Sequence, residues 1–412
     1  MKRYFNILLS PSVVFSGIVA GIIIGATNEE LSARVAPFGD IYLSLLQACI
    51  LPIMITAIIS SLGRLLTTGY AFSYIGRLVF VFVAGLTLAG MLGLTSGLIS
   101  KPGKGVDRSD RITMGKTIFE AEVNYEKEAP RSSDFLSFVK KIVPTNIFRA
   151  LTEGQNIAVL FFSILIGIAL GLIRSSSSNT TLSVIDSLYD AFLKIIGWIM
   201  YGLPFGLMCL IANQISKVGI AIILAMLKLI IIFYACAFIL LIGYSIVIWF
   251  RVRGTYIRSL LSLKETLLVA LGTSSSFASI PSALRGLTRE LKVEKQTADL
   301  VVPLGISLNP HGSVVHFAIA AVFISQIYGI PFGLKEVSII LFGSIIAGLA
   351  ASGTPGLGGL SMISLVLDPL GLPSKVAVIL LAAIDPIVDP ILTAVNVYGN
   401  CASTTLIAKK TV

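Results

Sequence analysis

Apolar runs separated by short polar segments make up most of the first half of the chain. Several contain no charged residue at all, and the run at 218–250 contains only Lys228. Their lengths approach or exceed the roughly 20 residues that an α-helix needs to cross a bilayer. The pattern predicts spanning helices near 13–27, 41–62, 78–100, 156–174, 182–215 and 218–250. A turn is expected at "RSSSSNTT" (174–181), and Gly202, Pro204 and Gly206 should kink the helix that follows it.

The second half of the chain has a different pattern. "LLVALGTSSSFASIPSALRGL" (267–287) and "IIAGLAASGTPGLGGLSMISLVL" (345–367) are apolar at both ends but rich in serine, glycine and proline in the middle. Each apolar arm is about 8–12 residues long and therefore too short to span a bilayer. We expect two re-entrant helical hairpins, near 262–287 and 340–368. Paired interrupted segments of this kind are typical of inverted repeats in secondary transporters.

The composition agrees with a membrane protein. Of the 412 residues, 55% are hydrophobic and only 13% are charged, and the mean hydropathy is +0.93. These values indicate an all-α polytopic membrane protein. The N-terminal stretch "MKRYFNILLSPSVVFSGIVAGIIIG" resembles a signal peptide, but no cleavage site closes it convincingly, so we interpret it as a retained first helix.

The net charge of +10 does not indicate a nucleic-acid partner, because the basic residues form no cluster on an aromatic-rich polar face. Most of them fall on one side of the membrane if the N-terminus is cytoplasmic, as the positive-inside rule favours. We therefore expect both termini in the cytoplasm, the loop 101–141 outside, and a location in the cytoplasmic (inner) membrane. The four cysteines show neither zinc nor disulfide spacing, and no cofactor or metal is predicted.

Four polar stretches are expected to meet near the middle of the membrane. They are "TSSSFASIP" (273–281), "SLNPHGSVVH" (307–316), "ASGTPGLGG" (351–359) and "IDPIVDPILTAVNVYGN" (384–400). The second contains both histidines of the chain, beside a Pro-Gly helix break. Non-helical backbone at membrane depth is tolerated only inside protein or along a water-filled cavity. Free amides at half-helix N-termini would favour a ligand carboxylate there.

The last stretch places polar side chains along one face of a helix. Asp389, Thr393, Asn396 and Asn400 follow one another at intervals of 4, 3 and 4. Carboxylates within a membrane segment are rare and usually mark a substrate or ion path. Asp385 lies four residues before Asp389 and is a candidate for either an ion-path role or a structural one.

These elements resemble the glutamate/aspartate transporter family, also called the dicarboxylate/amino acid:cation symporters. The resemblance covers nearly all of the chain and is carried by the two hairpins, the last-helix aspartate and asparagines, "KIVPTNIFRAL" (141–151), "LFFSILIGIALG" (160–171), "YGLPFG" (201–206) and "VNVYGN" (395–400). It implies eight transmembrane helices, two re-entrant hairpins, a homotrimer and an elevator mechanism. Residues 1–77 and 142–217 would form a scaffold of helices 1, 2, 4 and 5. Residues 78–100 and 218–412 would form the moving transport domain, and 101–141 the extracellular loop.

The resemblance also implies a substrate site. Ser276 and Asn396 match residues that hold an α-carboxylate. Residues that hold an α-amino group match Asp389, Thr393, Ser274 and Thr354. Ser275 and Gly358 complete the expected set, and Ser313 stands where the family usually has threonine. Acidic-substrate members carry an arginine where this chain has Leu392. Because a buried carboxylate without its cation is costly, we expect a neutral amino acid as substrate.

The family's sodium ligands are largely replaced. Its motif N-M-D-G-T corresponds to Asn309-Pro310-His311-Gly312-Ser313, so that His311 replaces a sodium-binding aspartate. His316 replaces a tyrosine, Asn400 replaces a second aspartate, and Phe82, Gly85 and Leu86 stand at three further ligand positions. Imidazole is a poor sodium ligand. We predict loss of sodium coupling, with His311 either carrying a proton or merely filling the site in an uncoupled transporter or exchanger.

Three other functions remain open at this point. A proton-driven dicarboxylate transporter would fit Asn400, although such members generally lack an aspartate matching Asp389. An anion channel would show currents that do not depend on substrate. An intramembrane enzyme using His311 and serines 274–276 is disfavoured, because no motif ties a nucleophile to an acid–base partner. We therefore expect a transporter within the bilayer whose partners are a neutral amino acid, as small-molecule substrate, and protons.

Overall fold

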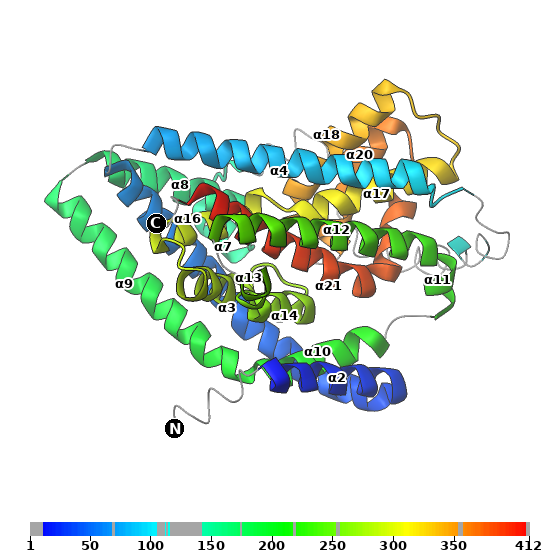
Figure 1. The fold of residues 1–412 in the computed structure, drawn as a ribbon, viewed down its shortest axis with the longest axis horizontal. Helices are drawn as coiled ribbons and strands as arrows, with labels where there is room; N and C mark the ends of the chain where they lie inside the picture. Colours follow the sequence, from blue (N-terminus) through cyan, green and yellow to red (C-terminus); the bar gives the residue numbers. More distant parts are fainter. Residues whose placement is uncertain are drawn as a thin grey trace.

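The computed structural model describes residues 11–67, 71–104, 112, 114–115, 142–173, 175–216, 220–252, 256–352 and 357–408. Within these ranges every regular element is helical (Figure 1). The predicted loop 101–141 lies mostly outside the described residues. The principal helices are α2 (Pro11–Thr27), α3 (Glu29–Thr67), α4 (Ala71–Ser100), α7 (Ile147–Thr152), α8 (Asn156–Ile173), α9 (Ser176–Ile199), α10 (Leu203–Ser216), α11 (Ile220–Ala225), α12 (Leu227–Val252), α13 (Tyr256–Leu261), α14 (Lys264–Thr273), α15 (Ile280–Arg285), α16 (Lys295–Leu308), α17 (His311–Ile327), α18 (Leu334–Ala351), α19 (Leu357–Leu360), α20 (Ser364–Leu367) and α21 (Ser374–Ile407).

The described helices include apolar helices long enough to span a membrane, as expected. Their number differs from the eight transmembrane helices that the resemblance implies. Seven helices or helix pairs are long and apolar enough to cross a bilayer within the described residues. They include the interrupted pair α16–α17 and the single helix α18, whereas α2 and α8 fall among the shorter apolar helices. The fold is that of an all-helical polytopic membrane protein.

The second spanning helix begins earlier than predicted. The charge-free run starts near 41, but α3 begins at Glu29. Asn28 Oδ1 accepts a hydrogen bond of 2.8 Å from the backbone N–H of Leu31, and Arg34 pairs with Glu30 one turn away. Acidic residues are favourable in a first helical turn. The charged start is thus a capped, exposed extension of the apolar helix.

The predicted turn at 174–181 was wrong from Ser176 onward, where α9 begins. Ser175 is the N-cap of α9, and its Oγ accepts a hydrogen bond of 3.1 Å from Ser178 N–H. Ser178 Oγ in turn donates to the Leu170 carbonyl of α8 at 2.5 Å. Serine is a good N-cap because its side chain satisfies a free N–H of the first turn. The predicted kink, by contrast, is present as a 3-10 turn, η1 (Met200–Gly202), between α9 and α10.

Helices α2, α3, α8, α9 and α10 of the first half pack together, whereas α4 lies beside α17 and α18 of the second half (Figure 1). The long helix α3 packs against α8, α9 and α10, while α2 packs against α10. Asp186 of α9 accepts hydrogen bonds from Ser60 and Arg64 of α3, which joins these two oblique helices within an apolar surface.

The second half contains the broken elements. Helices α14 and α15 pack together across the turn 274–279, and a five-residue π-helical turn, η2 (Gly286–Glu290), follows α15. Helix α18 packs against α20 across the region that contains the undescribed residues 353–356. These two paired-helix segments occur where hairpins were expected.

The helix α21 connects two hydrophobic cores. Its first half belongs mainly to one core and its second half to the other, and the helix packs with α12, α14, α16 and α17. Pro386 and Pro390 lie inside α21 without ending it. The boundary between the two cores falls near residues 394–397, which is where the polar stripe of α21 lies.

Candidate functional site

The site is built around a break between α16 and α17. Helix α16 ends at Leu308, and α17 begins at His311. Pro310 has no N–H to offer a preceding turn, and Asn309 has an extended φ of −138°. All residues from Ser307 to Gly312 except Leu308 are buried. A buried, unwound backbone needs partners from neighbouring helices, and α21 supplies them.

Asn309 contacts two residues of α21. Its Nδ2 donates to Asn400 Oδ1 at 3.1 Å and to Ser403 Oγ at 3.2 Å. Its Oδ1 is buried and has no hydrogen-bond partner among the described residues. The amide therefore fixes the break against α21 and leaves one acceptor unused.

Asn396 holds the first turn of α17. Its Oδ1 accepts hydrogen bonds from the backbone N–H of Gly312 at 2.7 Å and of Ser313 at 3.3 Å, and its Nδ2 donates to Ser313 Oγ at 3.3 Å. Asn400 Nδ2 donates to the Asn396 carbonyl at 2.9 Å. An amide from α21 thus caps a helix N-terminus of another element. We call Asn309, Asn396, Asn400, Ser313 and Ser403 the asparagine cluster.

Two glycines allow this close approach. A Cβ on Gly312 would lie 2.1 Å from the Leu392 carbonyl oxygen, and a Cβ on Gly305 would lie 2.1 Å from Asn400 Oδ1. The ring of Phe82 would be 3.3 Å from that second Cβ. Side chains larger than hydrogen would push α16 and α17 away from α21.

His311 occupies a slot between three helices. Its Nδ1 is 2.7 Å from the hydroxyl of Tyr244 on α12, an interaction in which either atom can hold the proton. A Cβ on Gly85 of α4 would lie 2.5 Å from His311 Nε2 and 3.6 Å from Asn309 Oδ1. A Cβ on Gly399 of α21 would lie 2.4 Å from Nδ1. The imidazole fits because both neighbouring positions are glycine.

The second nitrogen of His311 is left over. Nε2 is buried and has no hydrogen-bond partner among the described residues, as is true of Asn309 Oδ1. Both atoms face the notch at Gly85. Buried polar atoms without partners are rare and call for an explanation.

His316 does not join this group. Its ring stacks on Phe317 with centroids 5.5 Å apart, and Phe233 of α12 meets it edge-on at 5.1 Å. Nε2 of His316 is likewise buried without a partner in the described part of the chain. An aromatic environment surrounds it, and no hydrogen bond links it to the asparagine cluster.

The carboxylates of α21 lie further along the helix. Thr393 Oγ1 donates to Asp389 Oδ1 at 3.3 Å, and both Asp385 and Asp389 are half-buried. Tyr234 of α12 donates to the Ile387 carbonyl between them at 2.9 Å. No lysine or arginine forms an ion pair with either carboxylate among the described residues. Leu392 is buried, so apolar surface lies one turn from Asp389.

Serines 274–276 form the turn between α14 and α15. Ser274 has the left-handed φ of +49°, and its Oγ is buried without a partner within the ranges described. Ser275 Oγ accepts from Ala278 N–H at 3.3 Å, and the Ser276 carbonyl accepts from Ser279 N–H at 3.2 Å. No hydrogen bond joins these serines to the asparagine cluster in the described residues.

The second broken segment, α18–α20, contacts α16 next to the helix break. Ser352 Oγ donates to the Ile306 carbonyl of α16 at 2.7 Å, which places the end of α18 beside the helix break. Thr354 lies outside the described residues, and Gly358 lies in the short helix α19.

Sequence reasoning missed Tyr244 and Ser403. Ser403 extends the stripe on α21 by one further interval of three, so the spacing 4, 3, 4 would have reached it. Tyr244 is one of two tyrosines in the apolar helix α12, and nothing in the sequence around it distinguishes it from Tyr234.

A bundle of apolar helices that encloses polar side chains around a broken helix is typical of membrane transport proteins. Comparison with known families agrees. Residues 9–410 match the sodium:dicarboxylate symporter family, and the chain belongs to that family.

Curated relatives span the whole chain. The proton/sodium-glutamate symport protein of Geobacillus stearothermophilus is 30% identical over 404 residues, covering 96% of this chain and 93% of the relative. The C4-dicarboxylate transport protein of Brucella anthropi is 29% identical over 401 residues, with 96% and 87% covered. The proton/glutamate-aspartate symporter of Escherichia coli is 27% identical over 378 residues, with 91% and 84% covered.

Proposed function

We propose that this protein is a secondary active transporter of a neutral amino acid, driven by protons and independent of sodium. The observation that carries this proposal is the position of His311, whose imidazole fills the slot between Gly85 and Gly399. Sodium needs a shell of oxygen ligands, and a neutral imidazole nitrogen is a softer ligand suited to other metals. The slot holds an aromatic ring where the resemblance implies a cation site.

A proton is a better occupant of this slot than a metal ion. Tyr244 fixes one nitrogen of His311, and the other nitrogen faces the unpartnered Oδ1 of Asn309 across the Gly85 notch. The groups that face the imidazole are Gly85 from α4, Tyr244 from α12, Asn309 beside the break and Gly399 from α21. None of them is charged. Asp389 is ten residues from Gly399, about 15 Å along the helix, and no hydrogen bond or ion pair joins a carboxylate to the imidazole among the described residues.

The substrate assignment rests on α21. Asp389 and Thr393 offer an acceptor pair for an ammonium group, and Asn396 with the serine turn 274–276 offers groups for a carboxylate. Leu392 supplies apolar surface where the resemblance implies that acidic-substrate members carry arginine. A second carboxylate would be buried there without a cation, which is costly. A neutral amino acid matches these groups better than glutamate does.

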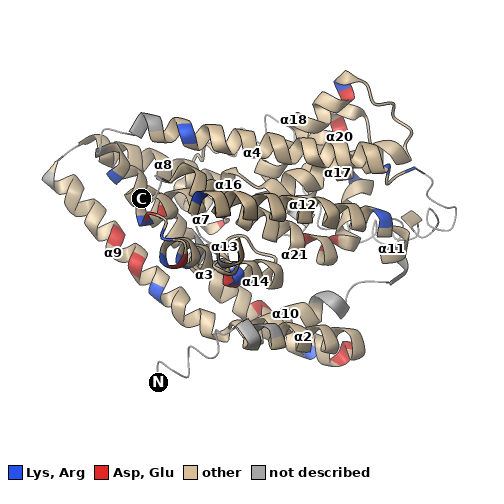
Figure 2. Cartoon of the chain, viewed as in Figure 1, with Lys and Arg blue, Asp and Glu red and all other residues tan. Residues whose placement is uncertain are grey.

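The architecture is part of the same proposal. We infer that α14–α15 and α18–α20 are re-entrant hairpins, that residues 1–77 and 142–217 form a trimeric scaffold, and that residues 78–100 and 218–412 move as an elevator. The packing of α3 with α8, α9 and α10 supports a scaffold unit. The basic residues that gather near the C-terminus (Figure 2) support a cytoplasmic position for that end in the inner membrane.

The test is uptake into proteoliposomes under a sodium gradient and, separately, under an inward proton gradient. We expect accumulation of a neutral amino acid with protons alone. Accumulation that requires sodium would disprove the coupling assignment. His311→Gln should abolish proton-driven accumulation while leaving exchange across the membrane, whereas unchanged pH dependence in that variant would remove the proton role.

Substrate specificity is tested separately. Leu392→Arg should admit an acidic amino acid and weaken uptake of the neutral one, with Leu392→Met as the matched control of similar volume. Tight binding of aspartate by the unmodified protein would refute the neutral-substrate assignment.

One alternative has a specific observation in its favour. A relative with 29% identity is a C4-dicarboxylate transport protein, and Asn400 resembles members of that kind. Proton-driven uptake of a dicarboxylate, with no amino acid bound, would support this alternative. Exchange without accumulation under any gradient would instead indicate that His311 only fills the site.

A further inference from the structure

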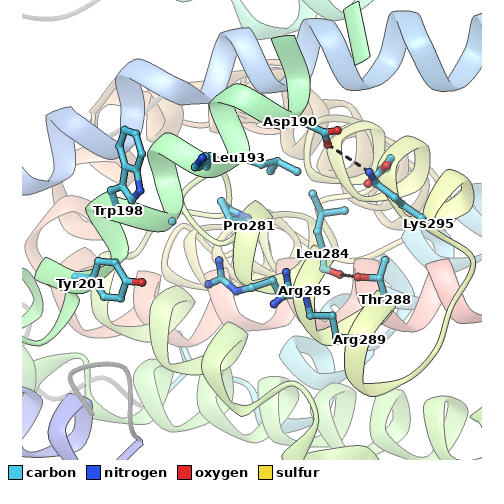
Figure 3. Close-up of a pocket in the computed structure, with 13 residues that line it drawn as sticks. Asp190, Leu193, Trp198, Tyr201, Pro281, Leu284, Arg285, Thr288, Arg289 and Lys295 are labelled. Carbon is cyan, nitrogen blue, oxygen red and sulfur yellow. Dashed lines mark hydrogen bonds and ion pairs between the residues drawn. The ribbon is translucent and has the colours of Figure 1, made fainter. Parts of the chain in front are cut away.

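A separate cavity lies between the two halves of the molecule. It measures about 660 Å³ and is bounded by α9 and η1 on one side and by α15, η2 and the start of α16 on the other. Figure 3 shows Trp198 and Tyr201 along the α9 wall, with Arg285, Thr288 and Arg289 on the opposite wall. None of the candidate site residues that the structure describes lines it.

The lining carries an excess of positive charge. Four cations, Lys194, Arg285, Arg289 and Lys295, face two carboxylates, Asp190 and Asp299. We call the space enclosed by these residues the basic cavity.

The two carboxylates do not neutralise all four cations. Lys295 Nζ is 3.3 Å from Asp190 Oδ1. Asp299 is buried and accepts a hydrogen bond of 2.8 Å from the Tyr189 hydroxyl of α9. Because Asp190 pairs with Lys295 and Asp299 accepts from Tyr189, neither carboxylate pairs with Lys194 or Arg289 among the described residues.

Two cations therefore remain unmatched. Arg285 is paired with Glu265 of α14 at 2.5 Å. Neither Lys194 nor Arg289 forms an ion pair or hydrogen bond with another described residue, and both are exposed. Lys194 belongs to the α9 wall and Arg289 to the opposite wall, so one ligand in the cavity can contact both cations.

The shape and remaining lining identify the chemistry of that ligand. Arginine binds phosphate through its planar fork of N–H groups, and lysine adds a point charge. Leu193, Pro281 and Leu284 give the cavity an apolar portion beside its cations. Trp198 is 61% exposed, and tryptophan and tyrosine prefer the region of lipid headgroups. The cavity can therefore hold a ligand that has a charged headgroup and an apolar portion.

We propose that the basic cavity binds a phosphate group, with Lys194 and Arg289 as its principal contacts. The ligand can be the headgroup of an anionic phospholipid or a free phosphate. Basic clusters at the ends of spanning helices attract anionic lipids, and further basic residues, with acidic ones among them, lie around α13 and α14 (Figure 2). The site joins α9 to α15, so its occupant would contact both halves of the transporter.

The two tryptophans of the chain provide a direct measurement. Trp249→Phe leaves Trp198 as the only tryptophan, at the wall of the cavity. The protein is reconstituted in phosphatidylcholine vesicles containing either brominated phosphatidylglycerol or brominated phosphatidylcholine at equal mole fraction. We expect stronger quenching of Trp198 by the anionic lipid. Lys194→Gln with Arg289→Gln should lower that preference about fivefold for each cation removed.

A matched control removes two lysines elsewhere. Lys335→Gln with Lys375→Gln makes the same charge change on exposed residues of α18 and α21 that do not line the cavity, and it should keep the preference. The proposal would be overturned if both lipids quench Trp198 equally in the parent protein and inorganic phosphate does not raise its unfolding temperature. An equal loss in both double variants would overturn it as well.

The source of the phosphate is decided by competition. The site is assigned to a soluble anion if millimolar inorganic phosphate removes the lipid preference. The same assignment follows if phosphate alone raises the unfolding temperature of the parent protein but not that of the Lys194/Arg289 double variant. Phosphatidylglycerol adducts that survive in native mass spectra, and fall by one per chain in the double variant, assign it to a lipid.

Discussion

The asparagine cluster and the basic cavity are two polar regions of the same apolar bundle, and they are built in opposite ways. In the asparagine cluster, short side chains from the α16–α17 break, α17 and α21 meet through hydrogen bonds of 2.7–3.3 Å, and Gly305 and Gly312 allow the helices to approach closely. In the basic cavity, long cationic side chains line about 660 Å³ of space. The asparagine cluster depends on close packing, whereas the basic cavity depends on its charge. Substitutions should therefore affect protein stability in the first and ligand binding in the second.

The largest effect is expected at Gly312. Its Cβ would lie 2.1 Å from the Leu392 carbonyl, a backbone atom that cannot rotate away. Gly312→Ala should lower the free energy of unfolding by about 3 kcal/mol, the upper range for overpacking. The thermal unfolding temperature in detergent measures this. Gly243→Ala on α12 is the control, because nothing lies within 4 Å of its Cβ; equal behaviour of both variants would refute the close fit.

The next effect is expected from the hydrogen bonds of Asn309. Asn400→Ala removes one acceptor of Asn309 Nδ2 and the donor to the Asn396 carbonyl, and should cost roughly 1–3 kcal/mol. Ser403→Ala should cost less, because Nδ2 keeps Asn400. A double-mutant cycle by thermal unfolding checks the coupling. Strictly additive losses would show that the three side chains do not act together.

A third effect concerns the slot that holds His311. Gly85→Ala places a methyl group 2.5 Å from Nε2, and should cost about 1–2 kcal/mol. In the His311→Ala background Gly85→Ala should cost little further stability, because the ring is the obstacle. Gly76→Ala on the same helix has open space around its Cβ and serves as the control. If Gly85→Ala costs as much stability in the His311→Ala background as in the parent chain, the ring and the glycine do not share the slot.

The smallest effect is expected in the basic cavity. Arg289→Gln should change the free energy of unfolding in lipid-free detergent by less than about 0.5 kcal/mol, since exposed residues without fixed partners contribute little. The same measurement on Lys335→Gln gives the comparison. A loss of several kcal/mol from Arg289→Gln would mean that this cation supports the fold, and the contrast between the two regions would disappear.

The spanning helices were predictable because a bilayer requires long apolar runs. The beginning of α3 and the serines before α9 were not, because helix caps and exposed charges extend a helix beyond its apolar run. Two of the four polar stretches, 307–316 and 384–400, meet as expected through Asn309, Asn396 and Asn400. Their spacing along helices indicated a shared face, and a shared face implies contact.

The rest of the site depends on contacts between helices that sequence spacing does not encode. Tyr244 touches His311 only because α12 crosses α17 at that level. Gly85 matters only because the imidazole of His311 lies beside it and leaves no space for a larger side chain. The basic cavity combines residues about a hundred positions apart, so no motif could show it. The roles of His311, Asp389 and the serine turn remain predictions for the transport experiments.

The length of α3 has a consequence for the membrane itself. Its 39 residues extend about 58 Å at 1.5 Å per residue, roughly twice the thickness of a hydrocarbon core. The helix must therefore lie aslant or project into the headgroups, and a thinner or thicker bilayer changes the balance between the two. Because α8, α9 and α10 all rest on α3, acyl-chain length acts on this half of the protein as a mechanical variable, separate from lipid charge.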